Sequence, residues 1–126
     1  MSKKGLKVLL LGSGKVLDAC PSKCHSCMSQ EEYEYIIGDA KRNGLLVRLD
    51  CDPLRMPDVL ATVYQPGWAD KVIGLYGGNF DIIIDEIQCI WNGPDDLHYE
   101  SEAAKLLKSD GLFYGWKNGK KTFFNI

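Results

Sequence analysis

Three short polar segments each follow an apolar run, and their residue types are suited to holding a ligand. They are Gly12-Ser13-Gly14, Asp50-Cys51-Asp52 and Asp85-Glu86. Glycines let a backbone approach a ligand closely, and a carboxylate after the second strand of an α/β unit can accept hydrogen bonds from both ribose hydroxyls. A Gly-x-Gly alone fits a simple tight turn equally well. Together with Asp50, one strand–helix–strand unit later, it predicts a nucleoside site.

The apolar runs that precede these segments must place them at one edge of a sheet. The runs 7–12, 45–50 and 79–85 are short, apolar and rich in branched residues, which is typical of parallel strands buried on both faces. Between the first two, Ser29-Gln-Glu-Glu32 has the spacing of a capping box and predicts a helix start. An apolar helical face and its stop signals follow at Tyr33, Ile36, Ile37, Ala40, Lys41, Arg42 and Gly44.

The second half of the chain completes an α/β pattern. We expect a short third strand near Val59 to Val63 and a helix near Trp68 to Leu75. Tyr99, Ala103, Leu106 and Leu107 form the apolar face of another helix, which we expect to end near Ser109-Asp110-Gly111 with the glycine in a left-handed conformation. A hairpin follows, with strands at 111–117 and 120–126 around the turn Asn118-Gly119.

These motifs resemble the class I S-adenosylmethionine-dependent methyltransferases over most of the chain. Val8-Leu-Leu-Leu-Gly-Ser-Gly14 is similar to their glycine loop, and Arg48-Leu-Asp-Cys-Asp-Pro53 with Pro57-Asp-Val59 is similar to a pattern of one branch. Phe80-Asp-Ile-Ile-Ile-Asp85 and the segment 102–111 resemble the fourth strand and the helix after it. The resemblance implies a Rossmann-like three-layer sandwich, with a mostly parallel sheet and a C-terminal antiparallel hairpin, in a single methyltransferase-like domain at 1–126.

The resemblance also implies a cofactor, S-adenosylmethionine, and a role for each matching residue. Gly12 and Gly14 would line the methionine and ribose region, Asp50 would bind the ribose hydroxyls, and Cys51 would lie beside the adenine. Thr62 takes the place of an acidic residue that often follows the third strand. The implied cofactor-binding set is Gly12, Ser13, Gly14, Asp50, Cys51, Asp52, Thr62 and Asp85, and the implied catalytic pair is Asp85 and Glu86.

The methyl acceptor is not identified by the sequence; a small molecule or a protein side chain fits. For an oxygen or nitrogen acceptor a general base is expected, and Glu86, His98 or Tyr64 could serve, although His98 more simply belongs to the surface. Trp68, Tyr76, Trp91 and Trp116 could stack on a planar ligand, but core or subunit contacts account for most such residues.

Two other functions stay open. The glycine loop does not run quickly into a helix, the usual sixth strand is missing and 126 residues leave little chain to cover a substrate. These features favour a homo-oligomer whose partner supplies a lid, or a non-catalytic nucleoside-binding or assembly module. A nicotinamide-dependent reductase is less favoured, because the loop lacks the third glycine of that motif.

Cys20, Cys24 and Cys27 have the spacing that holds a four-iron cluster in radical S-adenosylmethionine enzymes. Those enzymes use a longer, barrel-like scaffold than this chain can supply. With His25 the thiolates could instead offer zinc a Cys3His set. We interpret the cysteines as reduced thiols in a loop, with no metal, and a metal site as the alternative.

The composition and the lengths of the apolar runs make nucleic acid and membranes less favoured partners. Fifteen Lys and Arg against seventeen Asp and Glu give a net charge of −2, without a basic stripe, so nucleic acid is not favoured. The apolar run Val8–Leu11 is too short for a signal peptide or a membrane span. We expect a cytoplasmic protein that makes no contact with a membrane.

Overall fold

The computed structural model describes residues 5–12, 30–62, 66–85, 97–117 and 120–124. Strands and helices alternate along most of this part of the chain. The strands are β1 (Lys7–Leu11), β2 (Leu45–Asp50), β3 (Val59–Leu60), β4 (Phe80–Asp85), β5 (Leu107–Lys117) and β6 (Lys120–Phe124). The helices are α1 (Gln30–Asn43), α2 (Trp68–Tyr76) and α3 (Leu97–Leu106), with a 3-10 turn, η1, at Pro53–Arg55.

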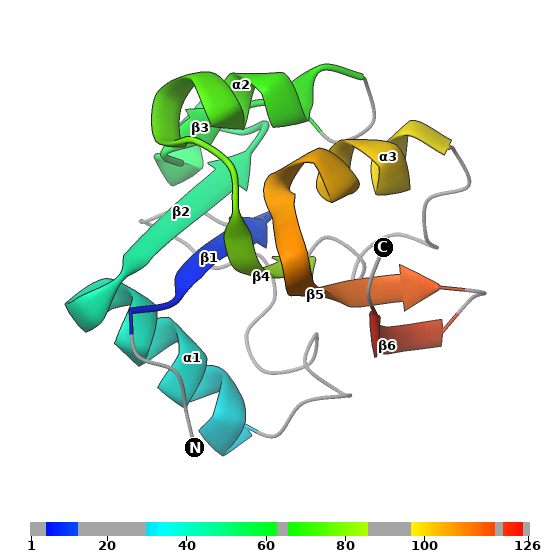
Figure 1. The fold of residues 1–126 in the computed structure, drawn as a ribbon. Coiled ribbons are helices and arrows are strands. Elements are labelled where there is room, and N and C mark those ends of the chain that lie inside the picture. Colours follow the sequence, from blue (N-terminus) through cyan, green and yellow to red (C-terminus); the bar gives the residue numbers. More distant parts are fainter. Residues whose placement is uncertain (1–4, 13–29, 63–65, 86–96, 118–119, 125–126) are drawn as a thin grey trace.

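The strands form one sheet in the order β3-β2-β1-β4-β5-β6 (Figure 1). Strands β1 to β5 are parallel, so their carboxyl ends share one edge. Leu11 at the end of β1 lies opposite Leu49 of β2 on one side and Asp85 of β4 on the other. The strand order reverses between β1 and β4, which is the point where open α/β sheets bind ligands.

Helices cover both faces of this sheet, as the sequence predicts for an α/β protein. On one face, α2 and α3 bury Trp68, Val72 and Leu106 against Leu9 and Leu11. On the other face, α1 buries Ile36 and Ala40 against Val8 and Leu10 (Figure 1). Successive residues of β1 therefore face opposite helical layers, and this explains why the strand is apolar from Val8 to Leu11 rather than alternating.

The third strand is shorter than expected. Only Val59 and Leu60 pair with β2, and Ala61 and Thr62 lie beyond the strand. Leu60 pairs with Asp50, the last residue of β2, so no strand residue of β2 lies opposite Ala61. Ala61 still donates its N–H to the Asp50 carbonyl.

The helix after β4 ends earlier than expected, and the role predicted for Gly111 is wrong. Helix α3 ends at Leu106 because Leu107 already pairs with Phe80 of β4. Gly111 lies inside β5, and its φ is not among the positive values. A Cβ there would lie 2.9 Å from the carbonyl oxygen of Phe80, so close packing, and not a left-handed helix end, calls for glycine.

At the C-terminal end, β5 and β6 pair antiparallel, with Phe113 opposite Phe124 and Lys117 opposite Lys120. The turn predicted at Asn118-Gly119 lies outside the described residues and stays a prediction, as does the Ser29 cap. In the described ranges, no helix is long and apolar enough to cross a membrane.

Candidate functional site

The end of β1 supplies the backbone of the candidate site. Gly12 is buried, and its φ of 82° lies in the region that favours glycine. Its N–H donates to the carbonyl oxygen of Leu49 over 2.7 Å. This bond ties the ends of β1 and β2 together, so Gly12 and Asp50 lie side by side at the carboxyl edge.

Asp50 at the end of β2 is 8% exposed, and its carboxylate is held from two sides. Its Oδ1 accepts the N–H of Asp52 over 2.9 Å. Its Oδ2 lies 3.8 Å from Nε of Arg55, which is an ion-pair distance and too long for a hydrogen bond. Each carboxylate oxygen can accept about two hydrogen bonds, so both oxygens keep acceptor capacity beyond these contacts.

Asp52 and Cys51 form the turn that follows. The Asp52 side chain accepts the N–H of Leu54 over 2.9 Å and so caps η1. This local bond gives Asp52 a structural role in addition to the predicted ligand-binding one. Cys51 is an exposed free thiol directly after Asp50.

Asp85 differs from Asp50 in accessibility and in direction. It is completely buried, with no exposed surface. Side chains alternate along a strand, so Asp85 faces the same layer as Ile83, under α2 and α3, whereas Asp50 faces the layer opposite to Leu49. The structure thus brings the two strand ends to one edge, but it directs their carboxylates to opposite faces of the sheet.

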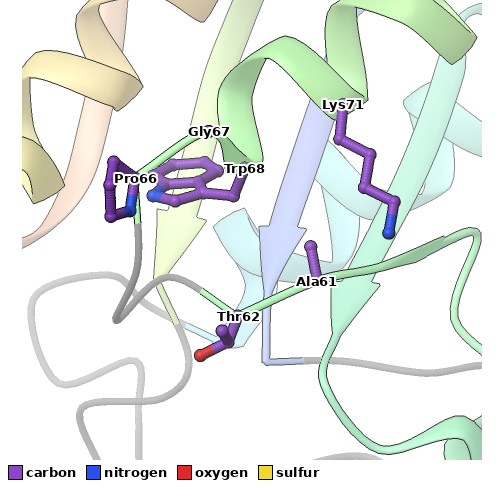
Figure 2. A pocket seen from close by; sticks show the side chains of 6 residues that line it. All are labelled: Ala61, Thr62, Pro66, Gly67, Trp68 and Lys71. Atoms are coloured by element: carbon purple, nitrogen blue, oxygen red, sulfur yellow. The ribbon is translucent and has the colours of Figure 1, made fainter.

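A surface cavity of about 280 Å³ lies between the end of β3 and the start of α2 (Figure 2). Ala61 and Thr62 form one side of this cavity, and Trp68 and Lys71 lie across from them. Thr62 is one of the predicted cofactor-binding residues, and Ala61 is bonded through its N–H to the Asp50 carbonyl. The cavity therefore lies beyond the end of β3, on the α2 side of the sheet, and Asp50 is not among its lining residues.

Trp68 forms a wall of this cavity, and its indole packs into the protein core. The side chain is 2% exposed, which confirms the core interpretation for this tryptophan. Its Nε1 is buried and makes no hydrogen bond with the described residues. Because this atom is closed off from solvent, a ligand in the cavity does not reach it without a rearrangement.

Glu102 is a buried carboxylate that sequence reasoning missed. It lies in α3, is 4% exposed, and its Oε1 accepts the N–H of Ala69 in the first turn of α2 over 2.8 Å. Burial opposes the ionisation of Glu102, but hydrogen bonds from Ala69, Gly67 and Lys105 together lower the pKa of this carboxyl. The N-cap of α2 is Gly67, which has no side chain to accept the N–H groups of the first helical turn. A glycine at this position was the sequence signal that an acceptor from elsewhere in the chain is needed.

Several predicted site residues lie outside the described ranges: Ser13, Gly14, Cys20, Cys24, His25, Cys27, Tyr64, Glu86 and Trp91. His98 lies in α3. Within the described ranges, no group of three or more His, Cys, Asp and Glu side chains is arranged to hold a metal ion. The interpretation of Cys20, Cys24 and Cys27 as reduced thiols, and the alternative of a metal site, thus stay predictions.

No family model, curated protein or solved structure matches this chain.

Proposed function

We propose that this chain is a Rossmann-like S-adenosylmethionine-dependent methyltransferase with its cofactor at the carboxyl edge of the sheet. One observation carries the proposal: Gly12, with positive φ, and Asp50 lie side by side at the carboxyl ends of β1 and β2, and β1 borders the point where the strand order reverses. In a doubly wound sheet this point binds a nucleoside, with the ribose at the acidic residue after the second strand.

The described residues fit the adenosyl part of such a cofactor. Asp50 offers acceptor capacity on both oxygens for two ribose hydroxyls, and Gly12 has no side chain to block a close approach. Thr62 lines the cavity beyond β3, and Cys51 is an exposed residue directly after Asp50; under the proposal both would lie near the adenine. The roles proposed for Ser13, Gly14 and Asp52 complete this binding set.

When bound, S-adenosylmethionine would supply a methyl group already activated by the sulfonium. The chain then needs only to position an acceptor, because positioning alone can supply much of the rate. We propose that Asp85 and Glu86 act from the end of β4. Because Asp85 is completely buried, we propose that it orients neighbouring groups. Glu86 would then be the residue that accepts a proton from the acceptor.

The burial of Asp85 also favours a second candidate function, a non-catalytic nucleoside-binding module. Such a module would keep the Gly12 and Asp50 contacts and lack an accessible carboxylate on β4. A cytoplasmic homo-oligomer acting on a small molecule or a protein, without nucleic-acid or membrane partners, stays a prediction under both candidates.

Calorimetry with S-adenosylmethionine tests the proposal. We expect binding by the unaltered chain and a loss of at least about 10-fold in affinity for Asp50→Ala, the order expected when a hydrogen bond to a charged group is lost. Asp110→Ala, at an exposed aspartate in the bulged start of β5, is the matched control. No binding by the correctly folded chain at millimolar ligand would refute the proposal.

Transfer of a labelled methyl group separates the two candidates. A methyltransferase passes the label to an acceptor in a mixture of small molecules or proteins, whereas a binding module retains it on the cofactor. Binding without transfer to any acceptor tested would support the second candidate.

A further inference from the structure

The turn after β2 brings a cation to the carboxylate that we propose as the ribose acceptor. The chain reverses through η1, where Asp52 caps the turn, Met56 adopts a left-handed φ of 56° and its N–H donates to the Pro53 carbonyl. This fold places Arg55, five residues after Asp50, so that its Nε faces both Asp50 and Asp52, at 3.8 and 4.0 Å.

The two partners of this ion pair are largely withdrawn from water. The Asp50 side chain is 9% exposed and the Arg55 side chain 22%, so solvent and salt screen the pair less than a pair on the open surface. Asp52, by contrast, is 47% exposed and already bonded to its own turn. Of these two carboxylates, Arg55 therefore acts mainly on Asp50.

These contacts restrict the rotation of the Asp50 carboxylate about its Cβ–Cγ bond. The Asp52 N–H holds Oδ1, and the Arg55 guanidinium attracts Oδ2. A carboxylate held in one orientation presents its two oxygens in constant directions, which favours a vicinal diol whose two hydroxyls bind both oxygens at once. A freely rotating carboxylate would lose part of this binding free energy to ordering.

We propose that Arg55 is a positioning residue that sets the selectivity of this edge for a ribose with both hydroxyls free. The inference rests on the proposed function, since it concerns the same Asp50 subsite. Arg55 does not touch the ligand in this account. It acts through the orientation of Asp50.

The test compares adenosine with 2′,3′-dideoxyadenosine by NMR titration of the full chain. We expect the unaltered chain to prefer adenosine by roughly 10-fold or more, the order set by hydrogen bonds to a charged group. Arg55→Met and Arg55→Gln should reduce this preference to about 2-fold or less, and Arg55→Lys should restore part of it. Arg42→Met, at an exposed arginine of α1, is the matched control and should keep the preference.

The ratio of the two affinities separates positioning from a merely structural role. A structural role would weaken both nucleosides equally and lower the melting temperature, so an unchanged ratio in the neutral variants would overturn the inference. That result, with adenosine still bound by the unaltered chain, leaves the proposed function standing. Absence of nucleoside binding by the unaltered chain would overturn both.

Discussion

Asp50 and Glu102 are both nearly buried carboxylates that accept backbone N–H groups, yet the structure gives them different surroundings. Glu102 accepts N–H groups from another element, the first turn of α2, and joins two helices. Among the described residues, the Asp50 carboxylate accepts one N–H, from Asp52 in its own turn, and Asp50 lies at the carboxyl edge beside Gly12. Burial alone therefore does not distinguish the structural carboxylate from the one that we propose to bind a ligand. The origin of the hydrogen-bond donors does.

The largest effect on stability is expected at Glu102. Glu102→Ala removes the acceptor for a buried N–H of α2 and leaves Lys105 without this partner, so the free energy of unfolding should fall by about 2–3 kcal/mol. Urea unfolding measures this loss. Glu102→Gln keeps an acceptor and should lose less, whereas equal losses for both variants would show that charge, not the bond to Ala69, holds the helices together.

Two glycine substitutions test the close contact between β4 and β5 and the open surface of α2. Gly111→Ala places a Cβ 2.9 Å from the Phe80 carbonyl oxygen, and we expect a loss of about 1–3 kcal/mol. Gly74→Ala in α2 meets open space and should raise stability by up to about 1 kcal/mol. Thermal unfolding of both variants checks the pair. A Gly111→Ala protein that is as stable as the unaltered chain would contradict the close approach of β4 and β5.

Acid should weaken the contact between α2 and α3. Folding lowers the pKa of Glu102 below its ordinary value of 4.5, so the stabilisation from its carboxylate is fully present above that value. It is lost as the pH falls through the lower, folded pKa. Urea midpoints measured between about pH 7 and about pH 3 should fall less in Glu102→Gln than in the unaltered chain. Parallel curves would show that other carboxyls, such as Asp39, carry the acid dependence.

The smallest change in stability is expected at Asp50. Asp50→Asn keeps an acceptor for the Asp52 N–H but loses the ion pair with Arg55, and the free energy of unfolding should fall by at most about 1 kcal/mol. The same urea experiment measures this change. A loss as large as that of Glu102→Ala would make Asp50 a structural residue and remove the contrast between the two carboxylates.

The elements of the core were predictable because they have strong local signals. The strands at 7–11, 45–50 and 80–85 are short apolar runs, and their parallel arrangement follows from the helices between them. Gly111 was misread because its constraint comes from Phe80, a residue distant in sequence that no local pattern reveals. The contacts of Glu102 with α2 and of Arg55 with Asp50 likewise depend on tertiary placement.

The most direct test of the ligand site at the carboxyl edge is to map the backbone amides that respond to S-adenosylhomocysteine, the demethylated form of the cofactor, by NMR. We expect the largest shift changes at Gly12, at Asp50 to Asp52 and at Thr62, with the Asp50→Asn protein folded but responding only at higher ligand concentrations. Shift changes confined to other parts of the chain, or none at saturating ligand, would contradict it.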